Sequence, residues 1–180
     1  MKDLQILIAG GTIDKEYCII KQENKPRAKS CIVGYIQNFV RPDVTVYEKT
    51  ITMLDSRDFT SQTREDIYKA ILASKSDNII ITHGTDTMTQ TGQYLKSKNI
   101  QGKKIILVGA FYPLQGFVPT DATFNLGFAI GALVNAKDGV YIAMNMKLFD
   151  PATANKNQAT GKFETSQELP CTKPSSKLYW

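Results

Sequence analysis

The chain has no long apolar segment, only three cysteines and a single histidine, and each scarcity excludes a class of function. No run approaches the roughly 18 apolar residues of a membrane-spanning helix, which argues against a membrane protein. Cys18, Cys31 and Cys171 form an odd set without CxxC spacing, so we expect reduced thiols and neither a disulfide framework nor a zinc site. Any catalytic triad that needs a histidine would depend on His83 alone.

The charge distribution and the first residues indicate the kind of partner and the location to expect. The 22 basic and 17 acidic side chains leave a net charge of +5, and the basic residues are scattered except near 21–29 and in the last residues. A nucleic-acid surface would be denser, so we expect a solvated surface and no nucleic-acid partner. Met1–Asp3 leads directly into a short apolar pattern that lacks the apolar core of a secretory signal, which favours a cytoplasmic location.

Apolar runs alternate with segments of helical periodicity, and this order is typical of an α/β protein. We expect strands at 4–8, 44–50, 78–81, 104–108 and 139–144, and helices at 34–40, 62–74, 86–97 and 121–136. The prediction is a doubly wound, mostly parallel, flavodoxin-like sheet with helices on both faces, in a single domain. We assume the strand order 2-1-3-4-5, because periodicity does not reveal sheet order.

Two stretches have no clear periodicity. Residues 16–33 are interpreted as an irregular hairpin or mobile loop in which Tyr17–Ile20 and Cys31–Val33 are strand-like, so that Cys18 and Cys31 could face each other. Lys147–Lys162 is polar and is expected to be a loop. We divide the chain into a domain of residues 1–165 and a tail of residues 166–180, whose closing Leu178-Tyr179-Trp180 either stays disordered or docks on a neighbouring surface.

Two threonine-bearing loops follow buried strands and are the strongest functional signal. Ala9–Ile13 follows the first strand, and Thr82–Thr87 begins at the end of the third. In the assumed order these strands flank the point where the strand order reverses, which is where open α/β sheets bind ligands. The loop after the second strand adds Asp55–Asp58, and the loop after the fourth adds Gly109–Phe111. Such loops could assemble a nucleophile and an oxyanion site with no cofactor and no metal.

A threonine hydroxyl is a weak nucleophile near neutral pH and needs a neighbouring base. His83 lies in a strand-to-helix turn, where a buried ring that hydrogen-bonds to the backbone is the commoner role. Lysine can serve instead when it is partly desolvated, and the polar stretch after the last strand offers Lys156, with Lys147 and Lys162 as neighbours.

Ala-Gly-Gly-Thr-Ile at 9–13 and Thr-His-Gly-Thr-Asp-Thr at 82–87 resemble the two signature motifs of the bacterial L-asparaginases of the threonine amidohydrolase type. The second match is unbroken. Further similarity is found at Ser56–Asp58, Val108–Ala110, Phe124–Leu126 and Met144–Asn145. The resemblance covers residues 4–165, which correspond to the N-terminal domain of that family.

The resemblance implies hydrolysis of L-asparagine to L-aspartate and ammonia. Thr12 would attack the side-chain amide and form an acyl-enzyme that water then hydrolyses. Thr85, Asp86 and Lys156 would form the supporting relay. Tyr17 would be the flap tyrosine of the loop after the nucleophile, although Tyr35 competes for that role.

The resemblance also implies a substrate-binding set, which consists of Gly11, Asp55, Ser56, Gly84 and Ala110. Ser56 would contact the substrate α-carboxylate, Asp86 its α-ammonium group, and the Ala110 carbonyl its amide nitrogen. Backbone N–H groups near Thr12 and Thr85 would stabilise the oxyanion. Asparagine is the expected substrate with glutamine as a second, and the assembly is expected to be a homodimer or homotetramer.

Each assignment has a structural alternative, and the chain departs from the family in two ways. Thr12 and Ser56 could be turn residues, and Thr85 with Asp86 could cap the following helix. Family members are nearly twice as long, and Phe111-Tyr112-Pro113 stands where an arginine often occurs. A non-catalytic amino-acid-binding module and an ammonia-supplying amidase subunit of an amidotransferase therefore stay open. A nucleotide site is less favoured, because Gly10-Gly11-Thr12 lacks a full GxGxxG.

Overall fold

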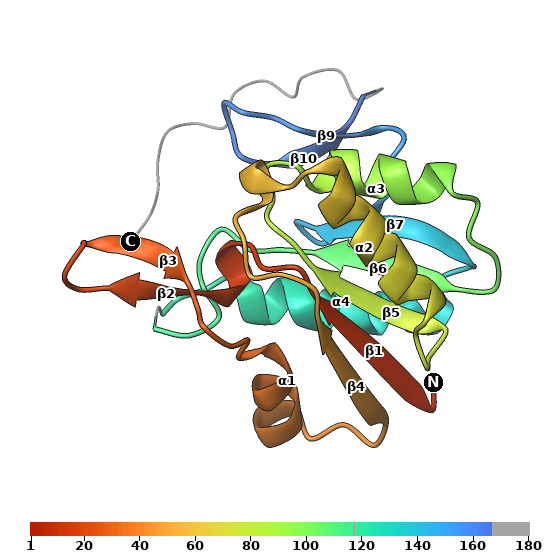
Figure 1. Cartoon of the computed structure of the whole chain (residues 1–180), viewed down its shortest axis with the longest axis horizontal. Coiled ribbons are helices and arrows are strands. Elements are labelled where there is room, and N and C mark those ends of the chain that lie inside the picture. The colour runs from red at the N-terminus through yellow and green to blue at the C-terminus, as the bar shows by residue number, and fades with distance from the viewer. Residues whose placement is uncertain (117, 167–180) are drawn as a thin grey trace.

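A six-stranded sheet forms the centre of the molecule. The computed structural model describes residues 1–116 and 118–166 of the chain (Figure 1). The strands of the sheet are β1 (Asp3–Ile8), β4 (Thr45–Thr50), β5 (Asn78–Thr82), β6 (Lys104–Val108), β7 (Gly139–Met144) and β8 (Lys147–Phe149). Their order is β4-β1-β5-β6-β7-β8, and every neighbouring pair is parallel except β7 with β8. The first five strands thus confirm the predicted order 2-1-3-4-5.

Helices cover both faces of the sheet, as expected for a doubly wound fold. The helices are α1 (Ile32–Tyr35), which continues as a π-helix over Ile36–Val40, α2 (Ser61–Leu72), α3 (Met88–Ser97) and α4 (Ala122–Asn135). Alternate strand residues face opposite layers. Leu7, Ile81 and Leu107 pack with α2 and α3, whereas Ile6 and Ile80 pack with α1 and α4. The α/β fold class is therefore confirmed.

Local sequence signals explain where these helices begin and end. The Thr60 side chain accepts a hydrogen bond from the backbone N–H of Thr63, and the Thr63 side chain accepts one from the Thr60 backbone, which forms a capping box at the start of α2. The π-helix ends at Arg41 in a left-handed conformation, one residue before Pro42. α3 begins at Met88, two residues after the predicted start, with Thr87 at its N-cap.

The amino-terminal hairpin differs from the prediction. It pairs β2 (Lys15–Cys18) with β3 (Glu23–Pro26), so Cys18 lies opposite Glu23 and not opposite Cys31. Cys31 instead precedes α1, because Asp14 Oδ1 accepts a hydrogen bond from its backbone N–H at 3.0 Å. The Ser30 hydroxyl accepts from the Ile32 backbone N–H at 3.1 Å, and these two contacts accompany the start of a helix where the strand preference of Cys31–Val33 had suggested a strand. Cys18 and Cys31 are both free thiols, and Cys171 lies outside the described residues.

The predicted loop at 147–162 was wrong in part, because it contains strands. Asn145 and Met146, both with positive φ, form a two-residue turn that folds β8 back on β7. β9 (Ala154–Lys156) then pairs with β10 (Phe163–Thr165) in a separate hairpin close to α3 (Figure 1). Short strands of three residues carry too little periodicity to be recognised in the sequence. The predicted tail, with Leu178-Tyr179-Trp180, lies outside the described residues beyond Ser166.

Candidate active site

Two glycines let three loops meet at the carboxyl edge of the sheet. A Cβ atom at Gly11 would lie 2.3 Å from the backbone nitrogen of Gly84, and a Cβ at Gly84 would lie 2.4 Å from Ser56 Oγ. These distances are far below van der Waals contact, so the Gly84 backbone packs directly against the Gly11 backbone and the Ser56 side chain, which joins the loops after β1, β4 and β5. Gly11 also has φ 87° and ψ 175°, a combination that is essentially restricted to glycine. The sequence Ala9–Thr12 therefore brings Thr12 beside the Thr85 loop.

Thr12 begins a 3-10 turn, η1 (Thr12–Asp14), and is partly exposed. The next residue is fully buried, and its carbonyl accepts a hydrogen bond from the Leu114 backbone N–H at 3.0 Å, which ties the turn to the loop after β6. Asp14 is also buried and accepts hydrogen bonds from Cys31 N–H and Sγ. Burial, reinforced by the Asp14 carboxylate, raises the pKa of the Cys31 thiol to about 12. The threonine is thus carried by a turn that is anchored on both sides.

Lys156 is the lysine that the structure brings to Thr85. Its Nζ donates a hydrogen bond of 2.9 Å to Thr85 Oγ1 and forms an ion pair with the Asp86 carboxylate. The lysine side chain is only 13% exposed. Lys147 instead lies over the ring of Phe149, 5.4 Å from its centre. The contact joins residues 71 positions apart in the sequence, and β9 provides it by positioning Lys156.

Asp86 and Asp55 belong to a group of charged side chains at the rim of the site. Asp55 pairs with Lys15 Nζ at 2.7 Å and with Arg57 Nε at 2.9 Å, and Arg57 also lies 3.7 Å from Asp86. The hydrogen bond from Arg57, helped by that from Lys15, holds the pKa of Asp55 well below its usual range despite its partial burial. Asp55 is therefore ionised and already paired, which suits a structural role at the rim better than direct substrate contact.

Ser56 presents a buried hydroxyl to the place where the loops meet. The residue is 1% exposed, and among the described residues its Oγ has no hydrogen-bond partner. Its carbonyl accepts a hydrogen bond of 2.8 Å from Thr87 Oγ1. A buried hydroxyl without a partner is costly, and a bound ligand would satisfy it. Thr87 occupies the N-cap position of α3, but its hydroxyl bonds to Ser56 and does not cap the helix, so this contact ties α3 to the serine loop.

His83 is a core residue and not a base. It is fully buried, with Nδ1 2.7 Å from the Gly84 carbonyl and Nε2 2.9 Å from Thr91 Oγ1. Because a carbonyl only accepts, Nδ1 carries the proton and Nε2 accepts from the Thr91 hydroxyl. Burial lowers the pKa of His83 to about 4, and its ring packs edge-on against Phe59. The structural role that the sequence favoured for this histidine is confirmed.

The loop after β6 forms the fourth side of the site through a network that the sequence did not reveal. Ala110 is 1% exposed, next to Gly109, where a Cβ would lie 3.3 Å from the Thr85 methyl group. Asn125 Nδ2 donates to the Gly109 carbonyl at 3.1 Å and to Asp121 Oδ2 at 2.9 Å. Asp121 and Asn125 are four positions apart, which is one helical turn, and this spacing could have indicated the hydrogen bond between them.

Tyr17 is carried by the amino-terminal hairpin that follows Thr12. It lies on β2 and is 48% exposed, and the β2–β3 hairpin projects from the body of the molecule (Figure 1). The competing Tyr35 lies on α1 and stacks on Phe39 with ring centres 5.6 Å apart. A flap role for Tyr17 therefore stays a prediction.

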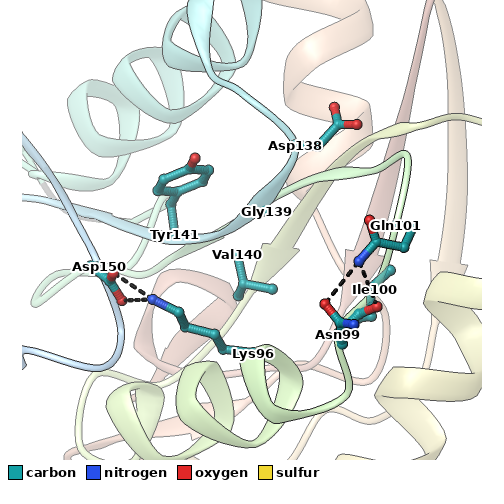
Figure 2. A pocket seen from close by; sticks show the side chains of 9 residues that line it. All are labelled: Lys96, Asn99, Ile100, Gln101, Asp138, Gly139, Val140, Tyr141 and Asp150. Carbon is teal, nitrogen blue, oxygen red and sulfur yellow. Dashed lines mark hydrogen bonds and ion pairs between the residues drawn. The ribbon is translucent and has the colours of Figure 1, made fainter.

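A cavity of about 310 Å³ lies elsewhere, at the start of β7 (Figure 2). Lys96 and Asp150 form an ion pair at one side of it, and Asn99 and Asp138 line the other (Figure 2). Gly139 marks the amino end of β7, so the cavity lies at the edge of the sheet opposite the threonine loops. Within residues 1–116 and 118–166 no group of three or more His, Cys, Asp or Glu side chains could hold a metal, and no helix could cross a membrane.

Comparison with known proteins identifies the family. A family model described as the N-terminal domain of asparaginase matches residues 3–173. L-asparaginase 1 of Escherichia coli K12 is 28% identical over 168 residues, which are 89% of this chain and 49% of that protein. L-asparaginase 2 of the same strain is 35% identical over 92 residues, which are 48% of this chain and 25% of that protein. The chain thus spans at most about half the length of these curated relatives.

A solved structure shows the same fold. The thermostable L-asparaginase from Thermococcus kodakarensis superposes with a TM-score of 0.79 at 24% identity, covering 91% of this chain and 51% of that chain. At this identity the likeness establishes the fold, while the family model, which matches most of the sequence, establishes the relationship. The chain belongs to the asparaginase family and corresponds to the N-terminal domain of its longer members.

Proposed function

We propose that this chain hydrolyses the side-chain amide of L-asparagine to L-aspartate and ammonia through a threonine acyl-enzyme. One observation carries the proposal. Lys156 contacts Thr85 and Asp86, and the loop of these two residues touches the loop of Thr12. A hydroxyl nucleophile needs a base or relay within hydrogen-bond reach. The buried His83 does not provide one, because its two ring nitrogens are engaged by Gly84 and Thr91.

In the proposed reaction the Thr12 hydroxyl oxygen bonds to the amide carbon, and its proton passes by way of the Thr85 hydroxyl to the amide nitrogen. The Lys156 ammonium group, paired with Asp86, donates to Thr85 and stabilises the negative charge that develops on the relay. The carbon–nitrogen bond then breaks, and ammonia leaves an ester on Thr12. Water then attacks the ester carbon through the same steps in reverse, which releases aspartate and restores the Thr12 hydroxyl. Backbone N–H groups of the Gly11 and Gly84 turns would bind the oxyanion, a contribution of about 3 kcal/mol per donor.

The remaining predicted residues have properties that suit an amino-acid substrate. The Ser56 hydroxyl, buried and without a partner among the described residues, would donate to the α-carboxylate. The Asp86 carboxylate, 42% exposed, would pair with the α-ammonium group. The Ala110 carbonyl would accept from the amide nitrogen. Asp55 would hold Lys15 and Arg57 at the rim, where they attract an anionic group.

Release of ammonia from asparagine, with glutamine as a second substrate, tests the proposal. Thr12→Ala is expected to lower kcat by about 10⁴-fold, since removal of a nucleophile abolishes the covalent route. Thr45→Ala, at an exposed position of β4, is the matched control and should leave kcat unchanged. Acid quenching and peptide mass spectrometry should find the aspartyl group on Thr12. Absence of ammonia release by the unaltered chain, or full activity in Thr12→Ala, contradicts the proposal.

The other outcomes of the same experiments identify the alternatives. Calorimetric binding of asparagine without turnover would support an amino-acid-binding module. Co-purification with a synthetase subunit would support an ammonia-supplying amidase. The homodimer or homotetramer, the cytoplasmic location and the domain of residues 1–165 remain predictions, and light scattering of the purified chain measures the first of them.

A further inference from the structure

The ring of Phe111 contacts the lysine of the candidate site. Lys156 Nζ lies 5.5 Å from the centre of this ring, within the distance of about 6 Å at which a cation is attracted to an aromatic face. The same ammonium group donates to Thr85 Oγ1 and pairs with Asp86. It therefore has three neighbours of different chemistry, which are a hydroxyl, a carboxylate and an aromatic ring.

The backbone of Phe111 is held in place by Asp121. Both oxygens of the Asp121 carboxylate accept from the Phe111 backbone N–H, at 3.1 and 3.0 Å, and one of them also accepts from Asn125. On the side of the β9–β10 hairpin, a Cβ at Gly161 would lie 3.8 Å from the ring, so the ring faces this turn. The ring is partly buried against the core. Asp121 thus fixes the backbone of Phe111, and packing against the core restrains its ring.

The Asp86 carboxylate by itself restrains the lysine only weakly. Asp86 is 42% exposed and is shared with Arg57, whose Nε lies 3.7 Å from it. A carboxylate that is this exposed restrains its partner weakly, because solvent screens the pair. A ring packed on the lysine excludes water from one side and attracts the charge at the same time. The ring is thus a less exposed neighbour of the lysine than the Asp86 carboxylate.

We propose that Phe111 is a positioning residue, whose ring face holds the Lys156 ammonium group against the Thr85 hydroxyl. The inference rests on the proposed amide hydrolysis for its effect on rate. A cation–π attraction depends on the electron density of the ring and not only on its bulk. Substituting hydrogen atoms of the ring by fluorine removes that density with little change of shape, which separates the two contributions.

The test is a series of full-length proteins with one, two, three and five fluorine atoms on the ring at position 111. We expect kcat for asparagine to fall stepwise by about fivefold in total, as the loss of one cation–π attraction implies, with KM changed less than about twofold. The same series at Phe128, a partly buried ring on α4, is the control and should leave kcat unchanged. A kcat that is independent of fluorination at 111, or falls equally at 128, overturns the inference.

A second measurement is independent of activity. The rate at which an acetylating reagent modifies Lys156, relative to the exposed Lys49, can be followed by mass spectrometry in the same proteins. Weaker attraction to the ring should increase this relative rate with each fluorine atom, and a constant rate overturns the inference. If the unaltered chain releases no ammonia, the proposed function fails, while the modification rates still decide the role of Phe111.

Discussion

Substitution of Gly11 by alanine tests whether the two threonine loops require a residue without a side chain where they touch. The backbone at Gly11 has φ 87° and ψ 175°, which costs a residue with a Cβ about 1–3 kcal/mol. The new Cβ would also lie 2.3 Å from Gly84 N and 2.4 Å from His83 C, and these are backbone atoms that cannot rotate away. Overpacking of this kind adds about 1–3 kcal/mol. We expect a total loss of about 4 kcal/mol in the free energy of unfolding.

Gly102→Ala is the matched control for this prediction. Gly102 also has a positive φ of 72°, but a Cβ there would have no heavy atom within 4 Å. Only backbone strain of about 1–2 kcal/mol is expected. Urea unfolding followed by circular dichroism measures both variants against the unaltered chain. Equal losses in the two variants would show that the close approach of Gly11 to Gly84 contributes nothing, and the reasoning about the site would then be refuted.

Two further predictions concern stability. Gly127 lies on the exposed side of α4 with nothing near its Cβ position, so Gly127→Ala should raise the free energy of unfolding by about 1 kcal/mol in the same urea assay, and a loss would contradict this. Burial lowers the pKa of His83 to about 4, so below pH 6.5 the unfolded chain binds a proton that the folded chain does not. This contribution to stability is present above pH 6.5, declines by about 2 kcal/mol at pH 5, and continues to fall until pH 4. His83→Gln should lack this part of the decline between pH 7 and pH 5, and parallel declines in both proteins would refute the assignment.

Much of the fold could be predicted because it depends on local periodicity. The continuous apolar runs Leu4–Ile8 and Asn78–Ile81 indicate strands that are buried on both faces, and both are found at those positions. The strands and turns of residues 147–165 were missed, since three-residue strands carry no usable period. The hairpin register was wrong for a related reason. Its β3 is polar and contains Pro26, and its pairing depends on the turn rather than on hydrophobic pattern.

The candidate site, like the fold, could be predicted only in part. Short motifs indicated Thr12, Thr85 and Ser56, because small residues after buried strands place backbone N–H groups and hydroxyls at one edge of a sheet. Nothing in the sequence indicated that Phe111 would pack on Lys156 or that Asp121 would hold the Phe111 backbone. The first contact joins two different loops and the second spans ten residues of one connection, so neither is encoded by immediate sequence neighbours.

The sequence by itself determined the five parallel strands, the helices and the two threonine loops, since each depends on residues within a few positions of one another. Only the tertiary structure decided which loops meet. The parallel pairing of β1 with β4 and β5 brings three loops together, and the absence of side chains at Gly11 and Gly84 lets them touch. The β9–β10 hairpin then provides Lys156, 71 residues from the hydroxyl that it contacts. Contacts of this range depend on the packing of the whole sheet, and no local pattern carries that information.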